Sequence, residues 1–153
     1  MNTQQSALLD NLKIIKPNFH AFTARFHSKL AESDIKMDYP AASQFNEKSF
    51  TLFCVLERIV KHINKPSQVA PFLVHHLAYL KKSGATQSDI SILADAFYDT
   101  LKEHLGRYFT HESQVAWRDA LNFFEKFANS TLFNFSNVIS FQQKIQQKQS
   151  NNS

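Results

Sequence analysis

Apolar residues recur every three or four positions along most of this chain, and the clearest such stripe runs from Phe45 to Ile63. Its members are Phe45, Leu52, Phe53, Leu56, Ile59, Val60 and Ile63. This spacing repeats on one side of an α-helix, so it predicts an amphipathic helix with one face in a core. No segment shows the alternation of apolar and polar residues that is typical of a β-strand. The pattern therefore predicts an all-α protein.

Further stripes predict helices over residues 6–16, 19–30, 67–82, 89–105 and 110–128. Pro17 interrupts the first of these, whereas Pro66 suits the first turn of a helix. Gly84 and Gly106 each follow a helix end, where glycine is favoured. We expect one domain over residues 1–135 and a polar tail over residues 136–153 that frays or is disordered.

Charge and cysteine content bound the class of protein. The net charge is +4 at pH 7, but the lysines and arginines are scattered, which favours a solvated surface over a nucleic-acid interface. Cys54 is the 1 cysteine, so no internal disulfide forms, and its neighbours Phe53 and Val55 predict a buried, unreactive thiol. The start, MNTQQSALLDNLK, does not have the pattern of a signal peptide, and no apolar run reaches the roughly 18 residues of a membrane span. We therefore expect a cytoplasmic protein with no membrane span.

The C-terminal half carries a family resemblance. The stretch ISILADAFYDTLKEHLGRYFTHESQVAWRDALNFFEKFA is similar to the last two helices of bacterial single-domain globins and of the globin domain of flavohaemoglobins. The matching motifs are Leu105-Gly106, Phe109-Thr110-His111-Glu112 and Ala116-Trp117. KPSQVAPFLVHHLAYLKKSGATQSD aligns upstream without a gap, with Pro71 and Gly84 as fixed points. The resemblance covers residues 5–130 and implies a globin-like fold of six to eight helices.

The resemblance also implies a haem pocket, with its iron held by a histidine at the position of Leu80. A leucine has no lone pair and cannot bind iron. The same alignment puts Lys48 at the distal position and His27 where bacterial members often have a tyrosine. The remaining implied pocket residues are Tyr39, or less well Met37, near the ring that wedges the porphyrin, Ile90 in place of a supporting tyrosine, and Leu52 on the stripe shared with Lys48.

His76 is the one candidate metal ligand. It lies four residues before Leu80, so on a helix it shares that face at about 5.4 Å toward the N-terminus. If haem bound one turn away, His76 would ligate its iron, with Lys48 or His27 opposite. Alternatively, His76 faces a haem-free pocket and bonds to a carbonyl or water. The other histidines are expected at the surface: His20, His62, His75, His104 and His111.

Lys48 and the aromatic residues leave two alternatives each. Lys48, partly turned inward, binds a haem propionate or a fatty-acid carboxylate, or its stem covers the core while its head reaches water. Large rings either fill the space that haem leaves in a globin or belong to an ordinary helical core. The rings in suitable positions are Phe50, Phe53, Phe72, Tyr79 and Phe97.

No enzyme is predicted, because the chain has no G-x-S-x-G, glycine-rich phosphate loop or H-E-x-x-H motif. The first functional hypothesis is a globin-like ligand-sensing or protein-interaction module, with no cofactor favoured. Its ligand would be hydrophobic or fatty-acid-like, and its signalling partner is unknown. The second hypothesis is a haem globin that binds oxygen or nitric oxide through His76. The third is a structural helical partner with no small ligand.

The family resemblance further implies a homodimer formed by the last two helices. Rings that would contribute to such an interface are Phe123, Phe127, Phe133 and Phe135, although they would serve equally well in the core. Both alternatives remain open at the level of sequence.

Overall fold

The computed structural model describes residues 3–133, which form helices joined by short connections. The α-helices are α1 (Thr3–Ile15), α2 (Phe19–Ala31), α3 (Ala42–Glu47), α4 (Ser49–Lys61), α5 (Pro66–Lys82), α6 (Gln87–Leu105) and α7 (His111–Leu132). Two 3₁₀ turns, η1 (Lys16–Asn18) and η2 (Gly106–Tyr108), lie between them. Because no residue of this range is in a strand, the all-α prediction is confirmed. The predicted tail, 136–153, lies outside the described residues.

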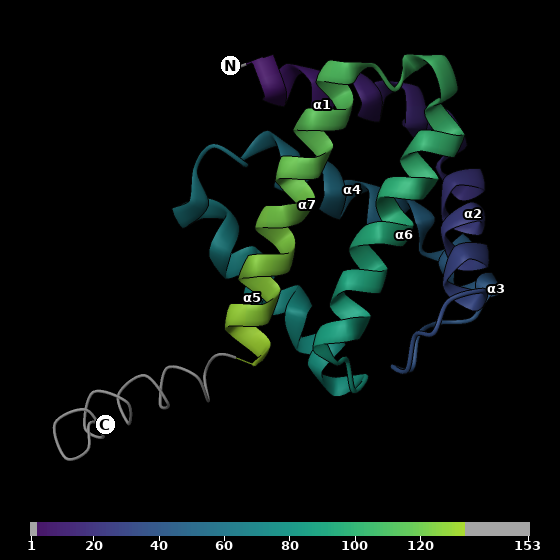
Figure 1. The fold of residues 1–153 in the computed structure, drawn as a ribbon, viewed down its shortest axis with the longest axis vertical. Helices are drawn as coiled ribbons and strands as arrows, with labels where there is room; N and C mark the ends of the chain where they lie inside the picture. Colours follow the sequence, from purple (N-terminus) through teal and green to yellow (C-terminus); the bar gives the residue numbers. More distant parts are fainter. Residues whose placement is uncertain (1–2, 134–153) are drawn as a thin grey trace, which may run out of the picture.

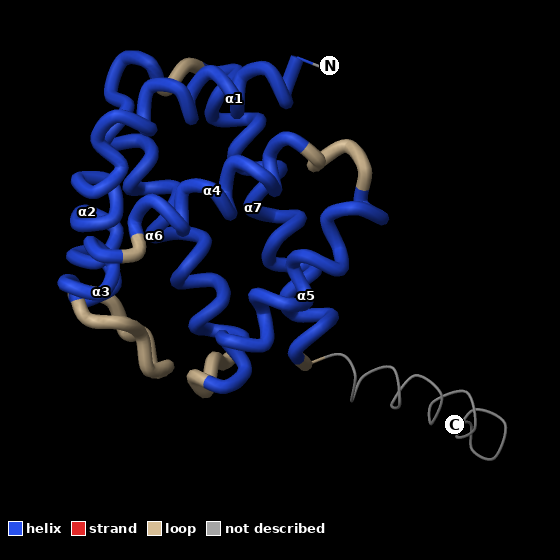
Figure 2. The backbone as a smooth tube through the Cα atoms, turned by 180° about the vertical axis from the view of Figure 1, so that it is seen from behind, coloured by secondary structure: helices blue, strands red, loops and turns tan. Residues whose placement is uncertain are grey.

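Helices α6 and α7 run antiparallel along the middle of the molecule (Figure 1). Helix α1 packs on α7 at one end, and α2 packs along α6. Helix α4 contacts both α1 and α2, and α5 contacts chiefly α7; Figure 2 shows these helices from behind. The short η2 connection explains the antiparallel pair, because a tight turn returns the chain beside the helix it has just left.

The main core lies where α1, α2, α4, α6 and α7 meet, and the side chain of Trp117 is 1 % exposed there. The phenylalanine rings of α2 take part, since Phe19 stacks on Phe22 with ring centres 5.4 Å apart. A smaller cluster of Leu77, Ile90 and Ala128 joins α5, α6 and α7. The apolar stripes read from the sequence therefore face these two clusters.

Proline and glycine begin and end the helices as the sequence predicts. Pro17 lies in η1, and Pro66 occupies the first turn of α5, where its missing N–H costs nothing. Gly84 follows α5 with φ of +81°, and the next residue, Ala85, donates its N–H to the Leu80 carbonyl at 3.1 Å. This is the Schellman arrangement, which satisfies carbonyls left open at a helix end.

The helix predicted over residues 45–63 is wrong in one respect, because it is broken at Lys48. Lys48 has φ of −98° and ψ of 8°, and it separates α3 from α4. Phe45 on α3 packs against Phe26 of α2, with ring centres 6.1 Å apart, whereas α4 also faces α1. Both segments contact α2, but α4 alone among them also packs on α1, and the change of direction at Lys48 accompanies this difference.

Candidate ligand cavity

An apolar cavity of about 290 Å³ lies between α4, α5, α6 and α7, with one residue of α2 at its edge. Helices α4 and α7 contribute equal numbers of lining residues, and most of those from α4 belong to the predicted stripe. The full lining is Phe26, Leu52, Val55, Leu56, Ile59, Val60, Ile63, Leu73, Leu80, Leu93, Ala94, Phe97, Trp117, Ala120, Leu121, Phe123 and Phe124. The cavity exists because α5 packs chiefly on α7, so that it stands away from α4.

The cavity wall contains no ionisable side chain. Its one polar group, the indole N–H of Trp117, donates to the side-chain oxygen of Asn11 at 2.9 Å. With its polar group already paired, the wall offers a ligand hydrophobic contact and little else. It cannot donate or accept a proton, so it does not support acid–base chemistry.

Leu80 and Leu52, two of the residues assigned to a pocket from the sequence, both line this cavity. They come from opposite walls, α5 and α4. Ile90 does not line the cavity, because it is completely buried in the small cluster with Leu77. Leu80 packs against the edge of that cluster, so it connects the cavity to the contact between α5 and α6.

His76 is half-buried and does not line the cavity. Its ring meets that of Phe72 edge to face at 4.6 Å between centres, and His75 lies 5.1 Å away. Burial, and secondarily the charge of His75, lowers the pKa of His76. Leu73 and Leu80 on the same helix do line the cavity, so His76 lies at the edge of this inner face of α5.

His27 and Tyr39 form a separate aromatic cluster with Phe45. The ring of His27 lies 5.4 Å from Tyr39 and 5.3 Å from Phe45, between α2, α3 and the connection that joins them. Neither His27 nor Tyr39 lines the cavity, and Met37, the lesser candidate, is buried near them in sequence. The structure therefore does not bring His27 and Tyr39 together with Leu80.

Three predictions about polar side chains are corrected by the structure. Lys48 is exposed rather than partly turned inward, because it stands in the break between α3 and α4. Cys54 is exposed rather than buried, since its neighbours on α4 face inward in its place. His104 is half-buried rather than at the surface, and its ring packs on Phe22 at 5.6 Å.

The aromatic residues predicted to fill a haem-sized space have different positions. Phe97 does line the cavity, with its ring 5.8 Å from Trp117. Phe53 instead lies in the main core, and Phe50 and Tyr79 are 73 % and 50 % exposed, so they fill nothing. Phe72 lies outside the cavity, between His76 and Arg58. The cavity is thus lined by aliphatic residues and by rings from α2, α6 and α7, and it is partly open to solvent.

The rings considered for a dimer interface pack largely within this chain. Phe123 lines the cavity, while Phe127 and Phe133 pack against the small cluster of Leu77. Phe135 lies outside the described residues. Helices α6 and α7 also border a hollow on the surface, and its lining includes the charged residues Asp95 and Arg118.

A second hollow, of about 310 Å³, was not predicted from the sequence. It lies between the end of α4 and the start of α5, and we call it the Arg58 hollow. Its lining is Arg58, Ile59, His62, Ser67, Gln68, Val69, Pro71 and Phe72. The spacing of Arg58 and His62, one helical turn apart beside the apolar stripe, was the available signal.

The described residues contain no cluster of three or more histidine, cysteine or acidic side chains that could hold a metal ion. Between residues 3 and 133, every helix is too short or too polar to traverse a lipid bilayer. Comparison of the chain with protein-family models and with curated proteins finds no match.

Proposed function

We propose that this chain is a haem-free, globin-like module that binds a small apolar ligand and reports its presence to a partner protein, without being an enzyme. The observation that carries the proposal is the apolar cavity of about 290 Å³ with Leu80 in its wall. A cavity of roughly 150 Å³ with similar walls can stay dry and bind benzene. The cavity here is large enough for a ligand of that size or greater.

The globin resemblance implies that Leu80 stands at the position of the iron ligand. In a haem globin a neutral imidazole at this position holds the iron. The leucine offers methyl groups to the cavity instead, and the α4 residues opposite are also apolar. This chemistry favours a hydrocarbon over a porphyrin, which needs a ligand for its metal and partners for its charged propionates.

Trp117 makes the proposal testable without a label, because it is the 1 tryptophan of the chain and it lines the cavity. We expect 1-octanol to change its fluorescence in a saturable way and to raise the melting temperature. Leu80→Phe adds volume to the wall and should abolish both effects. Val74→Phe is the matched control, because Val74 is on the same helix but is 47 % exposed and outside the cavity.

Absence of any response to apolar ligands, together with no bound molecule in native mass spectrometry, would refute this proposal. That result would favour the structural hypothesis, in which the helices serve only to contact another protein. The signalling partner and a homodimer through α6 and α7 are parts of the proposal that light scattering and co-purification test separately.

The alternative function is a haem globin with His76 as iron ligand, and one observation favours it. The pKa of His76 is lowered, so its imidazole is neutral at pH 7, and the neutral form is the one that binds iron. Helix α5 would have to turn to bring His76 into the cavity. Expression with added haem tests this: a Soret band that disappears in His76→Ala would replace our proposal with the alternative.

A further inference from the structure

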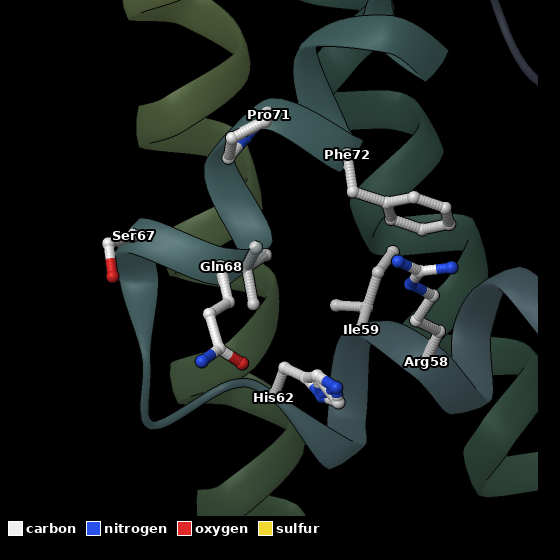
Figure 3. Close-up of a pocket in the computed structure, with 8 residues that line it drawn as sticks. Arg58, Ile59, His62, Ser67, Gln68, Pro71 and Phe72 are labelled. Atoms are coloured by element: carbon white, nitrogen blue, oxygen red, sulfur yellow. The ribbon is translucent and has the colours of Figure 1, made fainter.

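The Arg58 hollow has a mixed lining, in which Arg58, His62, Ser67 and Gln68 are polar and Arg58 supplies a positive charge. Figure 3 shows the Arg58 side chain lying beside Ile59 and beneath the ring of Phe72, with His62 and Gln68 nearby. Hydrogen-bond donors come from both helices, including Ser67 at the start of α5. None of the lining residues is acidic. The guanidinium and the absence of acidic lining residues favour an anionic group over a cation.

Arg58 forms no salt bridge with any carboxylate in the described part of the chain. Its guanidinium carbon lies 4.8 Å from the centre of the Phe72 ring. A guanidinium that stacks its flat face on a ring keeps its N–H edge for hydrogen bonds, and that edge matches the two oxygens of a carboxylate. The ring contact therefore places Arg58 beside Phe72, while its N–H groups are paired with no carboxylate in the described residues.

Ile59 separates this hollow from the apolar cavity and belongs to the wall of both. Because the two share this residue, a ligand with its hydrocarbon chain in the cavity would have to extend past Ile59 to place a polar head beside Arg58. Lys48, the cation considered from the sequence, is ten residues earlier in the chain, about 15 Å away along a helix, and it is exposed. Arg58 is exposed as well, but it lines the hollow beside the cavity and Lys48 does not, so Arg58 is the better placed of these two cations.

We propose that the ligand of the cavity is an amphiphile with a carboxylate head, and that Arg58 binds this head in the hollow between α4 and α5. The inference rests on the proposed function, since it needs the cavity to hold the hydrocarbon chain. It adds the chemical class of the ligand and the residue that selects it.

The test compares octanoate with 1-octanol, which differ in the charge of the head group. Both are titrated into the full chain near neutral pH, with Trp117 fluorescence as the readout. Arg58→Gln should weaken octanoate binding about tenfold or more, because the carboxylate loses its charge-assisted hydrogen bonds. It should leave octanol binding unchanged, which also shows that the variant is folded.

Arg107→Gln is the matched control, since Arg107 also stacks on a ring, that of Tyr108 at 5.0 Å, but lines neither the cavity nor the hollow. It should bind octanoate as the unmodified chain does. Arg58→Lys, which keeps the charge and loses the planar fork, should fall between the two.

The outcomes separate this inference from the proposed function. If Arg58→Gln and the unmodified chain bind octanoate equally well, the inference is overturned while the ligand cavity stands. If octanol binds and octanoate does not, the carboxylate class is excluded in the same way. If neither ligand binds, the proposed function itself fails, and the inference fails with it.

Discussion

The indole N–H of Trp117 donates a hydrogen bond of 2.9 Å to the side-chain oxygen of Asn11, and both side chains are buried. The Asn11 amide also donates to the Tyr108 carbonyl at 3.5 Å. One polar side chain of α1 thus holds a cavity-lining ring of α7 and the turn between α6 and α7. This pair links the stability of the fold to the position of the cavity wall.

Replacing Asn11 with alanine should destabilise the protein by about 1–3 kcal/mol, because the buried indole N–H loses its acceptor. Urea unfolding measures the change. Asn122→Ala on the exposed side of α7 is the control and should cost much less. A loss equal to that of the control would show that the hydrogen bond contributes little to folding.

Asp89 should stabilise the start of α6 through its hydrogen bonds to backbone N–H groups. Its buried carboxylate accepts the N–H of Lys36 at 2.7 Å and that of Thr86 at 3.0 Å. We expect Asp89→Asn to destabilise the protein by about 1.5–3 kcal/mol at neutral pH, since an amide loses the charge and aims an N–H at a donor. Asp10→Asn, at an exposed position of α1, should change stability little.

The effect of Asp89 should depend on pH. Burial acts to raise the pKa of Asp89, but the N–H groups of Lys36 and Thr86, with further donors, lower it overall. A lowered folded pKa means that the stabilisation is complete above the ordinary pKa of 3.8 and is lost as the pH falls through the folded value. Unfolding curves of the unmodified chain and of Asp89→Asn should therefore converge in acid. Curves that stay equally far apart would contradict this account.

His104 should make the protein less stable in mild acid. Its Nδ1 is buried with no hydrogen-bond partner in the described residues, and burial, followed by the charge of Arg25, lowers its pKa. The unfolded chain then binds more protons than the folded one below an ordinary pKa of 6.5, so stability falls as the pH drops through and below that value. One such group contributes a slope below about 1.4 kcal/mol per pH unit.

The variant His104→Phe should flatten this slope, which urea unfolding at a series of pH values measures. The lowered pKa of His76 adds a contribution of the same sign, so some slope should remain. His111→Gln changes an exposed histidine and should keep the full slope. An unchanged slope in His104→Phe would show that its burial does not affect titration.

Gly84 should be needed at the end of α5 only because its backbone adopts a left-handed conformation. Its φ is +81°, and a side chain there would meet no atom within 4 Å. Gly84→Ala should cost about 1–2 kcal/mol from the left-handed conformation, and Gly84→Asn less, because asparagine tolerates it better. Thermal unfolding of the two variants compares them. Equal stability of Gly84 and Gly84→Ala would show that the turn can adopt another conformation.

Local rules were sufficient for most of the helices. Pro66, Gly84 and Gly106 act within a turn of their own position, so their effects on helix ends could be read from the sequence. The inward faces of most helices followed from the spacing of their apolar residues. These features depend on neighbours in sequence, which a single chain displays directly.

Positions that depend on distant neighbours were wrong or were missed. Whether Cys54 or His104 is exposed depends on which helix packs against it, and spacing within one helix does not determine that. Arg58 was not considered as a site residue. Its assignment to a site depends on its contact with Phe72 of another helix and on the hollow that both residues line. The same reason explains why His27 and His76 were grouped with Leu80, although neither lines the cavity.

The sequence by itself determined that this protein is helical and where most of its helices begin and end. Only the tertiary structure decided that Leu80 faces an open apolar cavity, and that α3 and α4 part at Lys48. The physical reason is that helix formation depends on hydrogen bonds within a few residues. A cavity is instead the space that several helices leave between them, and its shape is a property of their packing.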